Sequence, residues 1–186
     1  MKPSLTGTAL CAAHTADVSV VTERLISYIQ DRSRILNLVA AGLEFSDVDF
    51  SGRHFWGSSF SGAIFKNCNF REVTMRTVFF DYAVFCNCDF SKSDFNFNTF
   101  GGACIQDCDF SNSELLHINF GGALLKDTVF DHSNLYNSRF IAADIANCSF
   151  NDCNVKKVFF VNARQHNVSF KASNTAEALF NMGDID

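Results

Sequence analysis

The feature that most constrains this chain is an apolar residue at every fifth position. From Phe45 to Phe170 this register runs unbroken over 26 positions, of which 18 are Phe, seven are other apolar residues and one, Gln165, is polar. An α-helix repeats every 3.6 residues and a strand every two, so neither brings a fifth residue back to the same face. The pattern therefore predicts a backbone that turns at regular intervals and points one apolar side chain inward at each interval.

A longer period of twenty residues lies on top of the period of five. When the apolar positions are sorted by twenty, two of the four columns consist of Phe alone. These columns are Phe50, Phe70, Phe90, Phe110, Phe130, Phe150 and Phe170, and Phe60, Phe80, Phe100, Phe120, Phe140 and Phe160. Stacking of like residues in successive coils explains such columns, with four five-residue units in each coil. Residues 43–172 then make about 6.5 coils, a rod of about 31 Å at the spacing of β-strands.

The residues beside the apolar positions repeat as well. A small residue usually stands two positions before, as in the column Ala63, Ala83, Ala103, Ala123, Ala143 and Ala163. A column of Asp and Asn stands two positions after: Asp47, Asn67, Asn87, Asp107, Asp127, Asn147 and Asn167. We expect these Asx side chains to bond the turns and to link one coil to the next.

This unit, small–Asp/Asn–Phe/Leu–x–x, resembles the repeat of the pentapeptide-repeat family over about 130 residues. The resemblance implies an all-β fold, a right-handed quadrilateral β-helix in which the large and the small residue of each unit both point inward. Each coil of such a solenoid contacts only its neighbours, so both ends need caps.

The segments outside the register are the expected caps. Residues 1–17 are predicted to be a flexible N-terminus. Residues 18–42 carry apolar residues at helical spacing before Gly42, which predicts an N-terminal capping helix. In residues 173–186, Asn174 is the expected N-cap of a short C-terminal helix. Its apolar side chains either seal the last coil or form a homodimer, as some members of the family do; they are Leu179, Phe180 and Met182.

Three residues depart from the inward pattern. Arg53 takes a small inward position in the first predicted coil, where it can reach the rim. Asn98 takes one in the middle of the rod and must find a hydrogen bond there, because an unpaired buried polar group costs about 1–3 kcal/mol. Gln165 marks the end of the apolar filling.

The sequence predicts no catalytic, cofactor or metal site. Most of the eight cysteines stand at small inward positions and act as small apolar residues, so no four ligands converge as a zinc site requires. The five histidines fall in different columns, and none lines up with a Ser or Cys as a nucleophile–base pair. We therefore expect a protein that is not an enzyme.

Charge and hydropathy limit the classes of partner that the chain can bind and the compartments in which it is expected. The net charge of −5 argues against direct nucleic-acid binding. No apolar run approaches the roughly 18 residues that span a bilayer, and the N-terminus is a poor signal peptide. The chain is expected in the cytoplasm, or delivered elsewhere without a cleaved signal.

The acidic residues are unevenly distributed along the predicted rod. Four of them fall on neighbouring outward columns of adjacent coils, and we name these residues the acidic patch: Asp89, Asp94, Asp109 and Glu114. The patch is a candidate site for a partner protein. The alternative is a solvated face that keeps the rod soluble.

Three functions remain open. The main expectation is a recognition or scaffold protein that binds an unidentified protein through the faces of the rod. The resemblance also implies an alternative, since some family members imitate DNA, bind DNA gyrase and topoisomerase IV, and so protect against quinolones or toxins. The net charge of residues 43–172, with 11 bases and 14 acids, is only −3, whereas 31 Å of DNA carries roughly 18 charges. A further alternative is a secreted bacterial effector that acts in a host cell.

Overall fold

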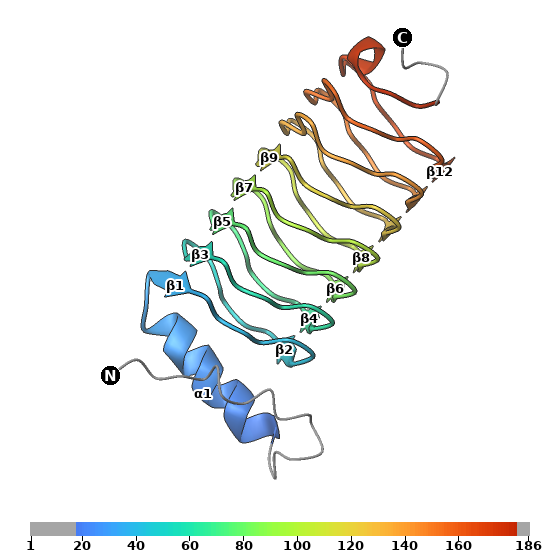
Figure 1. The fold of residues 1–186 in the computed structure, drawn as a ribbon. Helices are drawn as coiled ribbons and strands as arrows, with labels where there is room; N and C mark the ends of the chain where they lie inside the picture. The colour runs from blue at the N-terminus through green and yellow to red at the C-terminus, as the bar shows by residue number, and fades with distance from the viewer. Residues whose placement is uncertain (1–17, 182–186) are drawn as a thin grey trace.

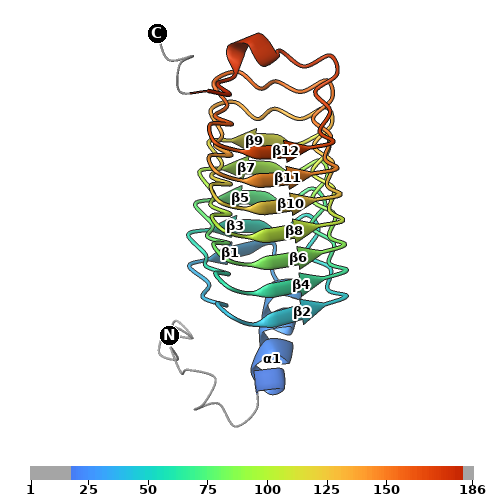
Figure 2. The same cartoon turned by 90° about the vertical axis from the view of Figure 1, so that its right-hand side faces the viewer.

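The computed structural model describes residues 18–181, which form a parallel β-solenoid of about seven turns (Figure 1). One helix lies across the N-terminal end, and the turns follow one another along a single axis. Seen from the side, the turns form an evenly spaced stack (Figure 2). The predicted β-helix is therefore confirmed.

The helix α1 spans Val18–Gln30 and every strand is three residues long. The strands are β1 (Arg34–Leu36), β2 (Glu44–Ser46), β3 (His54–Trp56), β4 (Ile64–Lys66), β5 (Thr74–Arg76), β6 (Val84–Cys86), β7 (Asp94–Asn96), β8 (Cys104–Gln106), β9 (Glu114–Leu116), β10 (Leu124–Lys126), β11 (Asp144–Ala146) and β12 (Arg164–His166). A single 3-10 turn, η2, covers Thr175–Glu177.

Each strand except β9 and β12, which end the two sheets, pairs in parallel with the strand twenty residues further on. In one sheet Phe45 is the partner of Phe65 and Phe65 the partner of Phe85. The first sheet has the order β1-β3-β5-β7-β9, and the second runs from β2 through β4, β6, β8, β10 and β11 to β12. The two sheets form opposite sides of the rod (Figure 1), and isolated bridges such as Asp89 to Asp109 link the turns on the remaining sides.

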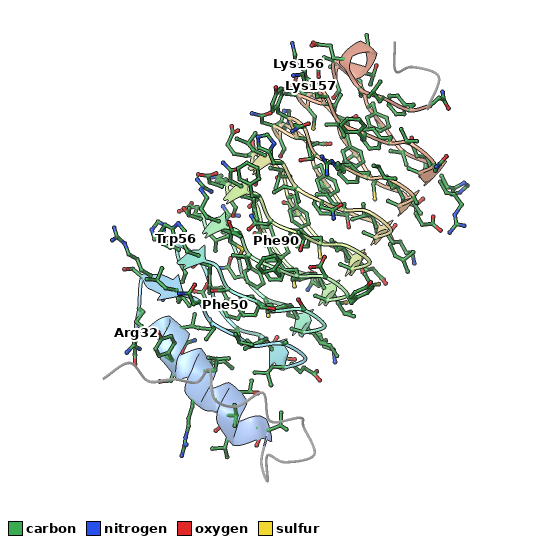
Figure 3. All side chains as sticks on the ribbon, viewed as in Figure 1. Arg32, Phe50, Trp56, Phe90, Lys156 and Lys157 are labelled. Carbon is green, nitrogen blue, oxygen red and sulfur yellow. The ribbon has the colours of Figure 1, made fainter. Side chains whose placement is uncertain are left out.

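The interior is a set of phenylalanine ladders. In the column that begins at Phe50, successive ring centroids lie 4.5 to 5.1 Å apart and the rings are within 12° of parallel. Rings of different columns meet edge to face, as Phe140 and Phe150 do at 5.5 Å and 90°. Both are geometries that aromatic pairs prefer. Figure 3 shows Phe50 and Phe90 inside the coils.

Polar residues at the small inward positions are satisfied by hydrogen bonds between turns. The Ser93 hydroxyl donates to the Phe70 carbonyl at 2.9 Å and accepts from the Val73 amide at 3.2 Å. Asn98 does the same: its Oδ1 accepts from the Val78 amide at 2.7 Å and its Nδ2 donates to the Met75 carbonyl at 3.1 Å. The expected hydrogen bonding of Asn98 is thus confirmed.

The corners place every fifth residue from 37 to 172 in the left-handed region of backbone conformation. Asn and Asp tolerate this region better than other residues with a side chain, which explains the Asx column. As expected, these side chains also link the turns: Asn67 Nδ2 donates to Asp47 Oδ1, and Asn87 Nδ2 donates to Asn67 Oδ1, both at 3.0 Å.

The N-terminal helix is shorter than predicted. It ends at Gln30 instead of continuing to residue 42, and the chain from Arg34 onward already belongs to the solenoid. Ile35 and Ala40 are buried at inward positions, so the five-residue register starts earlier than Phe45 and adds half a turn to the predicted 6.5. The apolar residues of this segment fit both periods, and pairing with the next turn decides between them.

Arg53 joins the helix to the first turn. Its Nε donates to the Ile29 carbonyl at 3.3 Å and its Nη2 to the Gln30 carbonyl at 3.2 Å. These carbonyls lack partners within the helix, and a cation suits the negative end of the helix dipole. Leu25 and Ile29 are buried, so α1 caps the ladder with apolar contacts as well.

The C-terminal end also differs from the prediction. Asn174 does not cap the 3-10 turn with its side chain, because its Oδ1 accepts from the Val155 amide at 2.7 Å. Leu179 bridges to Phe159, and Phe180 stacks on Phe160 at 5.1 Å. Both residues therefore continue the solenoid. Met182 lies outside the described residues, as do residues 1–17.

Candidate functional site

Two corners of the rod open into grooves that run parallel to its axis. In each groove, one rim is the corner column with left-handed backbone, the other rim is the column just before the next inward Phe, and the floor is the column of small inward residues between them. We name the two grooves by their linings, the acidic groove and the aromatic groove.

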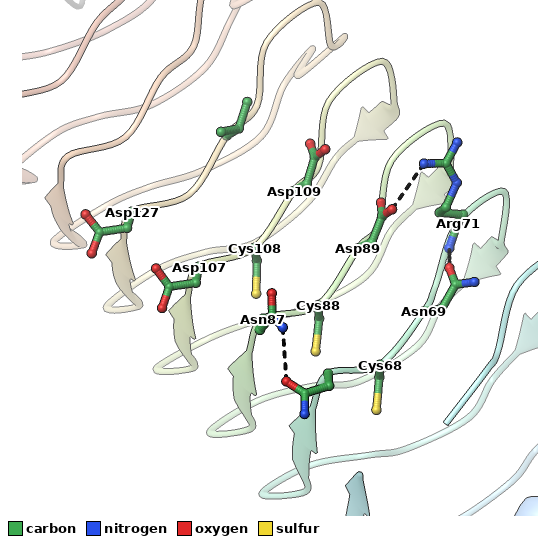
Figure 4. A pocket seen from close by; sticks show the side chains of 12 residues that line it. Cys68, Asn69, Arg71, Asn87, Cys88, Asp89, Asp107, Cys108, Asp109 and Asp127 are labelled. Atoms are coloured by element: carbon green, nitrogen blue, oxygen red, sulfur yellow. Dashed lines mark hydrogen bonds and ion pairs between the residues drawn. The ribbon is translucent and has the colours of Figure 1, made fainter. Parts of the chain in front are cut away.

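The acidic groove encloses about 610 Å³ along several turns in the N-terminal and middle part of the rod (Figure 4). It holds four carboxylates and one guanidinium, a formal charge of −3. Its lining is Asn67, Cys68, Asn69, Arg71, Asn87, Cys88, Asp89, Asp107, Cys108, Asp109, Asp127 and Val129.

Asp89 and Asp109, on the rim just before the next inward Phe, are held by neighbouring groups. Asp89 Oδ2 lies 3.2 Å from Nη1 of Arg71, and its Oδ1 accepts from the Ser91 amide at 2.9 Å. Burial raises the pKa of Asp89, but the hydrogen bonds from Ser91 and the charge of Arg71 outweigh it and bring the pKa below its ordinary value. Asp109 Oδ1 accepts from the Ser111 amide at 2.7 Å. Both side chains are therefore fixed in direction.

Asp107 and Asp127, on the rim formed by the corner column, belong to the column of Asp and Asn residues. Asp107 accepts from Gln106 Nε2 at 3.1 Å. Asp127 lies 3.7 Å from Lys126 Nζ and accepts from Asn147 Nδ2 at 2.9 Å. The sequence interpretation took this column as turn residues only, although its period of twenty already placed two carboxylates one turn apart.

The structure divides the acidic patch between two sides of the rod. Asp89 and Asp109 line the acidic groove, whereas Asp94 in β7 and Glu114 in β9 belong to the first sheet, β1-β3-β5-β7-β9. Asp94 forms an ion pair with Arg76, and Glu114 accepts from Asn134 Nδ2 at 2.8 Å. Arginines of the preceding turn thus partly neutralise two of the four residues.

Three stacked cysteines form the floor of the acidic groove. Cys108 Sγ donates to the Gln106 carbonyl at 3.2 Å, and Cys68 Sγ lies 3.4 Å from the Phe45 carbonyl. The contact with Cys108 together with burial raises the pKa of the Cys88 thiol to about 12. Protonated thiols are poor nucleophiles and poor metal ligands. Between residues 18 and 181 no group of His, Cys, Asp and Glu is arranged to hold a metal ion.

The aromatic groove lies at the corner that follows the first sheet, β1-β3-β5-β7-β9, and encloses about 270 Å³. Its lining contains no carboxylate: Phe97, His117, Ile118, Asn119, Asn137 and Arg139. The sequence interpretation did not single out these residues. Their signal was the appearance of Phe97 outside the inward register.

The repeat itself decides the family. The sequence model of the family described as Pentapeptide repeats matches eight copies over residues 44–81, 80–112 and 118–156, more than half of the chain. The chain belongs to the pentapeptide-repeat family. No curated protein matches it in sequence.

Solved structures of the family share the fold at low sequence identity. A trypsin-treated variant of QnrB1, described as a plasmid-mediated fluoroquinolone resistance protein, is 16% identical over 76% of this chain and 89% of that chain, with a TM-score of 0.51. HetL from the cyanobacterium Nostoc, described as involved in the regulation of heterocyst differentiation, is 10% identical over 84% of this chain and 95% of its own, with a TM-score of 0.37. At 16% identity the likeness to QnrB1 concerns the fold alone.

The described residues 18–181 include no helix that is both long enough and apolar enough to cross a membrane.

Proposed function

We propose that this pentapeptide-repeat protein is a non-enzymatic recognition rod that binds a basic surface of another protein through the acidic groove. The observation that carries the proposal is the charge of this groove, where four carboxylates face one arginine in an open channel of about 610 Å³. A Lys- or Arg-rich surface would relieve the repulsion among the carboxylates and steer the encounter.

The rigidity of the groove supports this role. Its rims belong to backbone that pairs with the turns on both sides, as in the bridges from Asn69 to Asp89 and from Asp89 to Asp109. Few side chains need to be ordered on binding, so little of the interaction energy is lost to entropy.

A basic peptide tests the groove. Fluorescence anisotropy of a labelled Lys/Arg octapeptide should show binding that weakens at least about fivefold in the double variant Asp107→Asn/Asp127→Asn, the equivalent of about 1 kcal/mol. The matched control, Glu44→Gln/Asp144→Asn, removes the same charge from positions that do not line the groove. An equal loss in both double variants would show that only net charge matters and would refute the assignment.

A type II topoisomerase is a second candidate partner. The specific observation in its favour is the placement of Asp89 and Asp109 on one rim of the acidic groove and of Asp107 and Asp127 on the other, two rows of charge that resemble the phosphates of two strands. The fluoroquinolone resistance in the description of QnrB1 gives a reason for the assay, although the two chains are only 16% identical. If gyrase supercoiling is neither inhibited nor protected from a quinolone at micromolar protein, this candidate is removed.

A secreted effector is the further alternative, in which the rod binds its partner inside a host cell. A translocation reporter fused to residues 1–42 tests it. Retention of the reporter in the bacterium would count against delivery and would favour the cytoplasm.

The C-terminal end is a candidate homodimer interface. Phe170 and Phe180 are half-buried, whereas the Phe residues of the middle turns are fully buried, so the ladder ends with partly exposed rings. A second copy would cover them together with the half-buried Leu179. Sedimentation should show a dimer for the native chain and a monomer for Phe180→Ser; a monomer in both would refute the dimer.

A further inference from the structure

Phe97 is a large apolar residue at an exposed corner of the rod. It occupies a corner position with a φ of 56°, a left-handed conformation that is unfavourable for a bulky residue. Its side chain is 61% exposed, whereas Phe95 and Phe100 on either side are fully buried. The same column holds Asn at positions 37 and 137, which suits the corner better. Every corner of the rod from residue 37 to 172 has this backbone conformation, so it does not single out Phe97. Neither backbone preference nor burial, however, explains why this corner carries a Phe.

Phe97 is the first of a series of rings on successive turns. Its ring stacks on that of His117 with centroids 4.6 Å apart and planes 8° from parallel. Tyr136 meets His117 edge to face at 6.0 Å, and Lys157 Nζ lies 5.6 Å from the centre of the Tyr136 ring. Asn137 Nδ2 lies 2.8 Å from His117 Nδ1, within hydrogen-bond distance. The rings are therefore held in place.

The cavity beside these rings is suited to an anion on an apolar stem. Because Phe97 and His117 stack face to face, a ligand beside both meets their edges, which carry positive partial charge. Arg139 lines the opposite rim and has no ion pair with the described residues. Asn119 Oδ1 accepts a hydrogen bond from the Gly121 amide at 3.0 Å, so its side-chain amide nitrogen remains a donor at the cavity. Ile118, 1% exposed, forms the apolar floor.

We propose that the aromatic groove binds an extended acidic segment of a partner protein. A carboxylate side chain of the segment pairs with Arg139, and a neighbouring aromatic or aliphatic side chain packs against Phe97 and Ile118. A peptide fits better than a small molecule because exposed side chains of the same two columns follow the cavity on the neighbouring turns. Phe79, 39% exposed, precedes Asn119 and Arg139 in their column, and Lys157 follows Asn137 in the column of Phe97.

Charge complementarity selects an acidic peptide. The cavity lining carries one guanidinium and no carboxylate, and Lys157 on the next turn adds a second cation. Figure 3 shows Lys156 and Lys157 near the C-terminal end of the rod. The salt bridge from Lys156 to Glu177 occupies the first of these lysines. The site is separate from the acidic groove and does not depend on its function.

The test uses the full chain and a fluorescein-labelled octapeptide, Gly-Ser-Glu-Phe-Glu-Leu-Ser-Gly. Anisotropy should show saturable binding that weakens at least about fivefold in Arg139→Gln and in Phe97→Asn, and at least about tenfold when both Glu of the peptide are replaced by Gln. Asn is native to this column, so Phe97→Asn is expected to remain folded, and circular dichroism checks this. Lys171→Gln is the matched control, because it removes an exposed cation from a different side of the rod.

Several results would overturn the proposal. These are the absence of binding at about 1 mM protein, equal affinity for the Glu and Gln peptides, or an equal loss in Lys171→Gln and Arg139→Gln. Complete competition by an equimolar small carboxylate such as benzoate would assign the cavity to free carboxylates instead of peptides. The double variant Asp107→Asn/Asp127→Asn should bind the peptide undiminished; a loss there would place the peptide in the wrong groove.

Discussion

Truncation of a single ring in the middle of a ladder tests the stacked interior most directly. Phe110 is fully buried between Phe90 at 4.5 Å and Phe130 at 5.1 Å, and the rings of Phe100 and Phe120 meet it edge to face at 6.1 and 6.2 Å. Phe110→Ala removes the ring and leaves a cavity lined by these four. The turns on both sides are held by backbone pairing and cannot collapse into the space. We therefore expect a loss of about 3–5 kcal/mol in the free energy of unfolding, toward the upper end of that range.

Guanidinium unfolding followed by circular dichroism measures this loss, and the fluorescence of Trp56 reports on the N-terminal turns in the same experiment. Agreement between the two probes tests whether the rod unfolds as one unit, since solenoids can unfold in parts. The adjacent change Asp109→Ala is the matched control. Its side chain is half-exposed and makes one bond to the Ser111 amide, so the cost should stay below about 1.5 kcal/mol.

A third variant separates position from residue type. Phe170→Ala removes the same side chain from the last turn, where the ring is only half-buried, and should cost clearly less than Phe110→Ala. Equal and small effects of Phe110→Ala and Asp109→Ala would refute the assignment of Phe110 to the interior. Equal effects of Phe110→Ala and Phe170→Ala would refute the view that the ladder ends near the C-terminus.

Three further predictions concern polar groups. Asn98→Ala leaves the buried Val78 amide without its acceptor and should lower the free energy of unfolding in urea by about 1–3 kcal/mol. Asn98→Ser should recover part of this loss, because Ser93 makes the equivalent hydrogen bonds one column away. Identical losses in the two variants would argue against the hydrogen bonds. The pKa of Asp89 is lowered in the folded chain, so the folded chain binds fewer protons than the unfolded one; the stabilisation by ionised Asp89 is complete above about pH 4 and is lost as the pH falls through the lowered pKa. The unfolding midpoint of Asp89→Asn should therefore depend less on pH between about 5 and 2 than that of the native chain. Parallel curves for the two proteins would contradict this. Burial raises the pKa values of the Cys148 and Cys153 thiols to about 11. Iodoacetamide at pH 8 should therefore modify the half-exposed Cys86 much faster than either of them, as measured by mass spectrometry of the modified sites. Similar rates at the three cysteines would show that the native rod opens readily.

Much of the fold was predictable because its period is the direct record of stacking. A residue that meets its own kind one turn above and below produces a column in the sequence, and the Phe50 column is evident from the order of the residues alone. The hydrogen bonding of Asn98 followed from the same register, since an inward amide in an apolar column must be satisfied. Where two periods overlapped, the prediction failed. The segment after Gln30 fits a helix by its apolar spacing, but its amides pair with the second turn, as Asn37 does with the Trp56 carbonyl at 2.9 Å.

The binding surfaces were less predictable, because they depend on side-chain directions across turns. The acidic patch brought together residues that share neighbouring columns, but a corner of the rod separates Asp89 from Asp94. Each pairs with an arginine eighteen residues earlier, a separation that no repeat of five or twenty reveals.

The sequence by itself determined that the chain has twenty residues per turn and which side chains point inward. Residues that stack on one another in successive turns have the same environment, so the same residue type recurs at equal intervals in the sequence. The tertiary structure alone decided where the helix yields to the first turn, which corners open into grooves, and which charges are neutralised. Those outcomes depend on the conformation of each corner and on contacts between turns. Two side chains brought together in this way carry no common period that the linear sequence could display.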